Sequence, residues 1–246
     1  MSRLAVITGG NSGIGEACAL RFATQGYEVV ICGRRGTLNR EVCERIHEAG
    51  GVAHSYTVDL RDARQLSECF RMIKSDHSPV ACLVNSIGIE GTPFTRTEDY
   101  DDTVFDDVLA TNVRAPWLCM KAVLPAMRLA RAGSIVNVAS LAGIRASATG
   151  GSAYSASKHA LVGMTRAAAR EYAPFGIRIN AVCPAFVRTP LSESVLGAAL
   201  EEAGSSHPLN RICEAQEVAS AVCWLSSQDA SFVTGIAMPV DGGTQA

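Results

Sequence analysis

A glycine-rich turn at residues 8–15, with the sequence TGGNSGIG, directly follows the apolar run 4–7. Apolar residues recur at helical spacing from Ile14 onward, which predicts that a helix begins inside the turn and ends at Gln25-Gly26. The first turn of a helix has unpaired N–H groups and a positive dipole end. The stretch therefore predicts a site for an anionic group such as a phosphate, although an ordinary glycine-rich turn fits the same residues.

Apolar runs and helical patterns alternate along the rest of the chain. We expect strands at 4–7, 27–32, 53–57, 81–84, 134–138, 178–182 and 236–240, and further helices at 38–49, 64–75, 101–129, 153–172 and 215–225. Continuously apolar strands separated by helices predict an α/β fold, a doubly wound parallel sheet of about seven strands with helices on both faces. This is the Rossmann arrangement, in which ligands bind at the carboxyl ends of the strands. With no linker in between, residues 1–246 are expected to form a single domain.

The alternation weakens after Pro184, where small and polar residues become frequent. We expect residues 188–210, with a helix near 191–203, to form a mobile flap over the substrate. The leucines and the valine of this segment predict an apolar wall; they are Leu191, Val195, Leu196 and Leu200. The small and polar stretch 143–151 is expected to form the opposite rim.

Composition excludes several classes of function. Lys and Arg total 22 against 24 acidic residues, so no basic excess points to nucleic acid. No apolar run reaches membrane-spanning length, and no signal peptide is recognised. Nine cysteines without a C-x-x-C pair predict reduced, buried thiols and a cytoplasmic protein, and five scattered histidines predict no metal site.

The glycine turn is expected to hold a dinucleotide rather than a nucleoside triphosphate. A P-loop would end in Lys followed by Ser or Thr, but Gly15 is followed by Glu16. About twenty residues further on, a dinucleotide site has an acid for NAD or an arginine for NADP. This position carries Gly33-Arg34-Arg35, and Arg34 can pair with a 2′-phosphate. NADP is therefore favoured and NAD remains possible, with a solvated arginine pair as the alternative.

Two further strand ends carry polar residues. Asp59 follows the third expected strand and can accept a hydrogen bond from the adenine amino group, or cap the helix that starts near Asp62. Asn85 follows the fourth strand and either pins its loop or contacts a ribose.

Tyr154 and Lys158 lie four residues apart in an expected helix, so they share one face and can reach one ligand. A nearby ammonium lowers the pKa of a phenol from about 10, which makes tyrosine usable as a general acid or base. Ser140 follows a strand at the carboxyl edge of the sheet, and Asn112 lies in the long helix. Each alone also fits a structural role: a snorkelling lysine, a strand-end serine, and a buried amide bonded to backbone.

Together these features resemble the short-chain dehydrogenase/reductase family over the whole chain, in its compact form, similar to 3-oxoacyl-ACP reductases. The matching positions are Thr8, Gly9, Gly13 and Gly15; Asp59-Leu60; Asn112; Ser140; Tyr154 and Lys158; Arg178-Ile179-Asn180; Pro184, Val187 and Thr189; and the terminal Val240-Asp241-Gly242-Gly243. Two positions depart from the family pattern, namely Ile87 in the loop after Asn85 and Ala185 after Pro184.

The resemblance implies roles for residues of this sequence. Catalytic residues are implied at Asn112, Ser140, Tyr154 and Lys158, and cofactor-binding residues at Gly9, Asn11, Ser12, Gly13, Ile14, Gly15, Arg34, Asp59, Leu60, Asn85, Gly88, Tyr154, Lys158, Pro184, Val187 and Thr189. In the family mechanism Tyr154 protonates the carbonyl oxygen, Lys158 holds the nicotinamide ribose, and Ser140 orients the carbonyl. Asn112 positions a water molecule next to Lys158, and Val187 and Thr189 bind the carboxamide.

The expected function is that of an NAD(P)(H)-dependent oxidoreductase that transfers hydride between nicotinamide and a ketone or secondary alcohol. A 3-oxoacyl-thioester reductase is a more specific alternative, and a dinucleotide-binding sensor without turnover belongs to a different class. A sugar-nucleotide epimerase is disfavoured because the chain is too short for a large substrate domain. The expected partner is a small-molecule substrate, with no nucleic acid and no membrane, and the resemblance implies a homotetramer.

Overall fold

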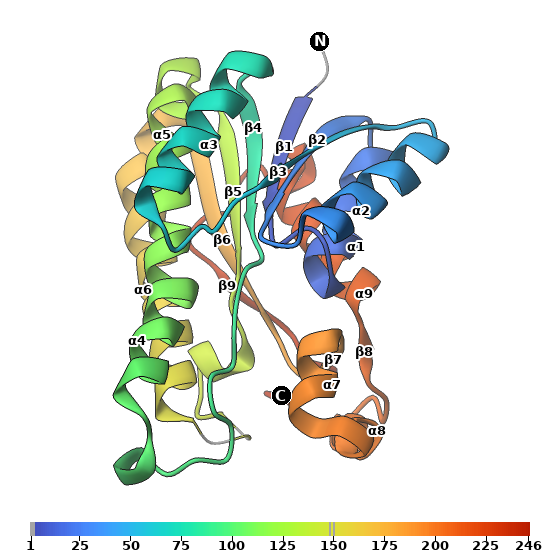
Figure 1. The fold of residues 1–246 in the computed structure, drawn as a ribbon, viewed down its shortest axis with the longest axis vertical. Helices are drawn as coiled ribbons and strands as arrows, with labels where there is room; N and C mark the ends of the chain where they lie inside the picture. Colours follow the sequence, from blue (N-terminus) through green and yellow to red (C-terminus); the bar gives the residue numbers. More distant parts are fainter. Residues whose placement is uncertain (1–2, 148, 150) are drawn as a thin grey trace.

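A parallel sheet of seven strands forms the centre of the computed structural model, which describes residues 3–147, 149 and 151–246 (Figure 1). The strand order is β3-β2-β1-β4-β5-β6-β9, and every neighbouring pair is parallel. The strands are β1 Arg3–Thr8, β2 Tyr27–Gly33, β3 Val52–Thr57, β4 Val80–Asn85, β5 Gly133–Val138, β6 Ile177–Pro184 and β9 Ala237–Val240. The predicted doubly wound sheet is therefore confirmed, and each expected strand lies within two residues of its observed bounds.

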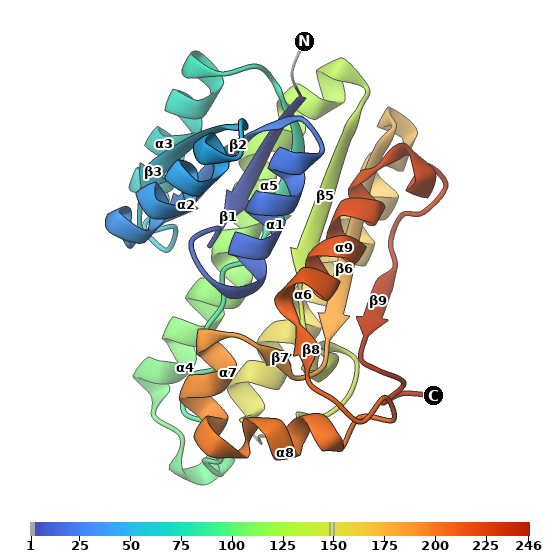
Figure 2. The ribbon, with the colours of Figure 1, turned by 90° about the vertical axis from the view of Figure 1, so that its right-hand side faces the viewer.

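Helices cover both faces of the sheet. One face packs against α1 Gly13–Thr24, α2 Gly36–Glu48 and α9 Ala215–Ser226, and the other against α3 Ala63–Asp76, α5 Ala115–Ala130 and α6 Ser152–Tyr172. Alternate residues of β1 belong to different cores, with Ile7 in the first and Val6 in the second, and neither is exposed. Such burial on both sides explains why the strands are continuously apolar. Figure 2 shows α1 and α9 lying side by side over one face.

β1 lies between β2 and β4: the chain adds β2 and β3 on one side of β1, then crosses over and adds β4 and the later strands on the other side. The glycine turn follows β1 at this point, and the backbone N–H of Gly9 donates to the carbonyl of Cys32 at the end of β2 (2.8 Å). Parallel sheets leave a crevice at the carboxyl ends of the strands where the order reverses. The fold thus brings the turn to the expected ligand-binding edge.

The long helix expected at 101–129 is two helices joined by a π-helical turn. α4 Asp102–Leu109 leads into the turn Ala110–Arg114, and α5 follows without a break in direction. Pro116 lies in the first turn of α5, where its missing N–H group is tolerated. π-helical turns are frequent at functional sites, and this one carries Asn112.

The segment expected to be the flap also differs from the prediction. Its single expected helix is wrong: α7 Pro190–Leu196 and α8 Leu200–Ser205 are separated at Gly197, which has a positive φ of 51°. A short two-stranded sheet, β7 Val187–Arg188 with β8 Cys213–Glu214, joins the two ends of the segment. No pattern in the sequence indicated this pair, because two-residue strands are too short to show a period.

The nine cysteines are free thiols, and eight of them are buried. Within the described residues, no helix combines the length and the apolar character needed to cross a lipid bilayer.

Candidate functional site

A cleft of about 590 Å³ opens at the carboxyl ends of the central strands. Most of the predicted residues line it: Gly9, Asn11, Ser12, Gly13, Ile14, Arg34, Asp59, Leu60, Gly88, Tyr154, Lys158 and Thr189. The other six predicted residues, Gly15, Asn85, Asn112, Ser140, Pro184 and Val187, do not line this cleft. Pro184 and Ser140 line a second pocket beside it.

The glycine turn brings backbone close to backbone. A Cβ atom at Gly15 would lie 2.2 Å from the carbonyl oxygen of Gly9, so a side chain there is excluded. Gly13 has a φ of +54°, in the left-handed region that glycine tolerates. Ser12 is the N-cap of α1, and its side chain makes no capping hydrogen bond. The turn thus leaves the helix N-terminus facing the cleft, as a phosphate site requires.

Arg35 was not among the predicted residues, yet its side chain is the one that reaches the turn. Its Nη2 donates to Oδ1 of Asn11 (2.9 Å) and to Oγ of Ser12 (2.7 Å). Arg34 is exposed and lines the mouth of the same cleft. The Arg34-Arg35 pair therefore places two guanidinium groups beside the end of β2, one tied to the turn and one at the mouth of the cleft.

Asp59 is engaged by a neighbouring arginine. Its Oδ2 accepts from Nη2 of Arg61 (2.8 Å), and hydrogen bonds from Arg61 hold the pKa of the carboxyl below its usual range. The helix cap that Asp59 was alternatively expected to provide comes from Asp62, which accepts from the backbone N–H groups of Arg64 and Gln65. Asp59 therefore lines the cleft and does not cap the helix.

Asn85 is buried and structural in this arrangement. Its Nδ2 donates to Oδ1 of Asn137 (2.9 Å), and its Oδ1 accepts from the hydroxyl of Thr8 (3.4 Å). Asn137 in turn donates to Oγ1 of Thr165 (2.9 Å). The chain of polar contacts ties β1, β4, β5 and α6 together. Of the two roles left open for Asn85, pinning its strand end is the one observed.

Tyr154 and Lys158 lie on one face of α6, as their spacing predicts. Nζ of Lys158 donates to the carbonyl of Val138 (3.1 Å) and lies 5.5 Å from the centre of the Tyr154 ring. Burial lowers the pKa of Lys158 from 10.5 to about 8. Burial and the nearby Glu90 carboxyl raise the pKa of Tyr154, while a hydrogen bond with Ser140 acts in the opposite direction. The net shift of the phenol pKa is therefore upward, because burial dominates.

Asn112 is fully satisfied by protein groups. Its Oδ1 accepts from the N–H of Ile89 (2.9 Å), and its Nδ2 donates to the carbonyl of Ile89 (2.9 Å) and to Oγ of Ser157 (3.0 Å). The side chain is buried, which matches the structural alternative for this residue. A Cβ at Gly88 would lie 3.3 Å from Nζ of Lys158 and 3.5 Å from Oδ1 of Asn112, so Asn112 holds the loop that borders Lys158.

The second pocket, of about 160 Å³, adjoins the cleft. Its walls include Ser140, Tyr154 and the expected apolar residues Leu191, Val195 and Leu196, whereas Leu200 is buried elsewhere. From the segment 143–151, which was expected to form the opposite rim, residues 145–147 and Thr149 line this pocket. Positions 148 and 150 lie outside the described residues.

Two polar residues in this pocket were missed from the sequence. Glu90 accepts from the hydroxyl of Thr149 (2.7 Å), and burial raises the pKa of its carboxyl. His207 is 4% exposed, and its Nδ1 lies 2.9 Å from the carbonyl of Arg211, which can only accept, so Nδ1 carries a proton. Its Nε2 has no hydrogen-bond partner among the described residues. Glu90 follows a strand-end loop and could have been noticed there, whereas nothing in the sequence around His207 marks it.

The buried ammonium of Lys158 predicts a pH-dependent stability difference. Below about pH 8 the Lys158 amine is protonated in both the folded and the unfolded chain, so the folded chain carries the full cost of burying the charge. Between about pH 8 and 10.5 only the unfolded chain holds this proton. The contribution of Lys158 to the free energy of unfolding therefore rises with pH over this range. Lys158→Met should thus gain up to about 3 kcal/mol relative to wild type near pH 7, and lose that gain by pH 10. Urea unfolding of both proteins at a series of pH values measures this difference in the free energy of unfolding. The exposed Lys74→Met is the control, and an equally flat difference in both variants would contradict the burial of the charge.

Comparisons with known proteins agree with this geometry. Residues 9–245 match the family model described as enoyl-(acyl carrier protein) reductase. The chain is 36% identical over 243 residues to a cyclohexanol dehydrogenase of Acinetobacter, covering 98% of this chain and 94% of the relative. An actinorhodin polyketide ketoreductase solved with NADPH superimposes with a TM-score of 0.94 at 33% identity, covering 99% and 97% of the two chains. A 3-oxoacyl-[acyl-carrier protein] reductase of Brucella melitensis with bound NAD gives 0.89 at 30%, covering 99% and 92%. The chain belongs to the short-chain dehydrogenase/reductase family.

Proposed function

We propose that the protein is an NAD(P)(H)-dependent oxidoreductase that transfers hydride between nicotinamide and a ketone or secondary alcohol, with Tyr154 as the general acid and base. One observation carries the proposal: Tyr154 lines both the larger cleft and the smaller pocket. A proton donor at the junction of a dinucleotide site and a substrate site is what reduction of a carbonyl needs.

The residues of the larger cleft fit a dinucleotide. The glycine turn and the start of α1 would offer N–H groups to the pyrophosphate, and Lys158, which lines the same cleft, would hold the nicotinamide ribose. Thr189, with Val187 and Pro184 before it, is proposed to bind the carboxamide. When bound, the reduced cofactor supplies the hydride that the carbonyl carbon receives.

The chain's own residues manage the proton. Because its pKa is raised, the phenol of Tyr154 is protonated at neutral pH and can donate to the developing alkoxide oxygen. The ammonium of Lys158, charged below about pH 8, is proposed to offset part of the cost that burial places on the phenolate once the proton has been donated. Ser140 shares the second pocket with Tyr154, and its hydroxyl is proposed to orient the carbonyl oxygen beside the phenol. Asn112 is proposed to act by positioning the loop next to Lys158.

NADP is the proposed preferred cofactor. Arg34 and Arg35 provide positive charge after β2, where an NAD-specific site would have a carboxylate. The relatives bound to NADPH and to NAD show that the family accommodates both, so the arginine pair is what supports the choice.

The substrate is proposed to be a small ketone or alcohol with an apolar body, because α7 contributes Leu191, Val195 and Leu196 to the second pocket. The named relatives include both cyclic-alcohol and 3-oxoacyl enzymes, so 3-oxoacyl-thioester reduction is the alternative within the same mechanism. We further propose that residues 1–246 act as one domain with a flap at 188–210, in a cytoplasmic homotetramer.

Tyr154→Phe should reduce kcat for carbonyl reduction by about 10²-fold or more, because it removes the donated proton and little else. The dissociation constant for NADPH should change by less than about threefold. Stopped-flow measurement of NADPH oxidation and fluorescence titration of the cofactor separate the two effects.

Tyr172→Phe, on the same helix, is the matched control and should retain wild-type rates. Full activity in Tyr154→Phe would rule out the mechanism. Tight NADPH binding without turnover in the wild-type protein, over a broad panel of carbonyls, would favour the sensor alternative.

Arg34→Asp should raise the Michaelis constant for NADPH at least tenfold while changing that for NADH far less, since a carboxylate repels the 2′-phosphate and can bind a 2′-hydroxyl. Arg64→Asp, on an exposed surface outside the cleft, controls for the general change in charge. Equal effects on the two cofactors would remove the NADP assignment, and an equal effect in Arg35→Asp would show that both guanidinium groups hold the phosphate.

A further inference from the structure

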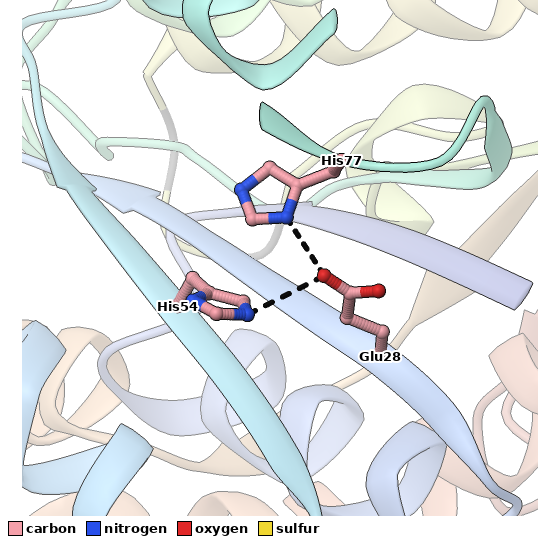
Figure 3. Close-up of side chains that lie close together, drawn as sticks. All are labelled: Glu28, His54 and His77. Carbon is pink, nitrogen blue, oxygen red and sulfur yellow. Dashed lines mark hydrogen bonds and ion pairs between the residues drawn. The ribbon is translucent and has the colours of Figure 1, made fainter. Parts of the chain in front are cut away.

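Glu28, His54 and His77 converge at the end of the sheet opposite the cleft (Figure 3). Glu28 is the second residue of β2 and His54 the third of β3, so both lie at the amino ends of parallel strands. His77 follows α3, which returns the chain to this end. The three residues come from separate elements, and their spacing in the sequence therefore resembles no metal motif.

The donor atoms point at one another. Oε1 of Glu28 lies 2.7 Å from Nδ1 of His77 and 3.3 Å from Nε2 of His54. One donor atom from each residue lies within 4.8 Å of the other two. The side chains of His77 and Glu28 are 5% and 15% exposed, whereas that of His54 is 45% exposed, so the cluster is held from inside and open on one side.

A neighbouring tyrosine fixes the orientation of His77. Nε2 of His77 lies 3.1 Å from the hydroxyl of Tyr56, and this hydroxyl donates to Oδ2 of Asp76 (3.0 Å). When the phenol proton is donated to Asp76, whose carboxylate can only accept, the Tyr56 oxygen accepts from His77 and the proton of a neutral imidazole lies on Nε2. A neutral His77 then has its lone pair on Nδ1, directed at the carboxylate of Glu28.

Two like acceptors 2.7 Å apart need a cation between them. Either His77 holds a second proton, or a metal ion bridges Nδ1 and the carboxylate. A second proton on His77, with a hydrogen bond from Nε2–H of His54, satisfies the carboxylate one donor at a time. A metal ion would use all three ligand atoms at once, and their convergence within 4.8 Å of one another is the geometry that favours it.

We propose that Glu28, His54 and His77 bind a divalent transition-metal ion, with Zn²⁺ as the best match to two imidazoles and a carboxylate. Tetrahedral bonds of about 2.0–2.1 Å separate ligand atoms by roughly 3.3 Å. The His54 to Glu28 distance already has this value, and the shorter His77 to Glu28 contact opens slightly on binding. Water completes the coordination from the exposed side of His54.

The contact between Nε2 of His77 and the Tyr56 hydroxyl, which in turn donates to the Asp76 carboxylate, would serve as the outer hydrogen bond that orients a zinc-bound histidine. The ion would join β2, the edge strand β3 and the end of α3. Because it lies at the end of the sheet opposite the cleft, its role is to stabilise this edge, and it does not depend on the proposed oxidoreductase activity.

Titration of metal-free protein with ZnCl₂ by isothermal calorimetry tests the proposal. We expect one Zn²⁺ per chain, and a melting temperature that rises with the concentration of Zn²⁺. His54→Ala, at a half-exposed position, should weaken binding at least tenfold, and Glu28→Gln should do the same. His159→Ala is the matched control on the exposed face of α6 and should bind like wild type.

Co²⁺ distinguishes this site from thiols, of which Cys213 is the least buried. Tetrahedral d–d absorption without a thiolate charge-transfer band, lost in His54→Ala, would support the assignment. A thiolate band, or equal affinity in wild type and His54→Ala, would overturn it. Absence of saturable binding would also overturn it, and ¹⁵N NMR spectra of His77 would then show which hydrogen-bonded form of the imidazole the cluster holds.

Discussion

The close packing of α1 against the end of β1 decides where this molecule can bind a ligand. The helix starts so near the strand that only glycine fits at position 15, where any side chain would collide with the carbonyl of Gly9. This approach directs the helix N-terminus at the point where the strand order reverses. The other features of the site are placed relative to it, because parallel strands bring their carboxyl ends to the same edge.

A buried polar network holds the chemical groups against that edge. Asn85, Asn137 and Thr165 connect β4, β5 and α6, so the helix with Tyr154 and Lys158 is fixed in register with the sheet. Lys158 also donates to the carbonyl at the end of β5. Polar groups this deep are costly unless all are paired, and their pairing explains how a tyrosine and a buried ammonium keep a defined position.

Much of the fold could be predicted from the sequence, because continuous apolar runs and helical periods report burial directly. The four-residue spacing of Tyr154 and Lys158 likewise placed both side chains on one face. Other features depended on tertiary contacts that no local pattern encodes. Arg35 reaches the glycine turn, Asp62 caps α3 in place of Asp59, and the amide of Asn112 is satisfied by protein. The convergence of Glu28, His54 and His77 was hidden for the same reason, since each residue lies on a different element.

The central claim is that hydride passes from a nicotinamide in the larger cleft to a carbonyl carbon in the smaller pocket, with Tyr154 between them. The most direct measurement is reduction of a panel of ketones with (4R)- and, separately, (4S)-deuterated NADPH, followed by mass spectrometry of the alcohol. The account predicts one deuterium on the carbinol carbon from one labelled form and none from the other. An alcohol without deuterium from both forms, or no alcohol from any ketone despite saturating cofactor binding, would contradict it.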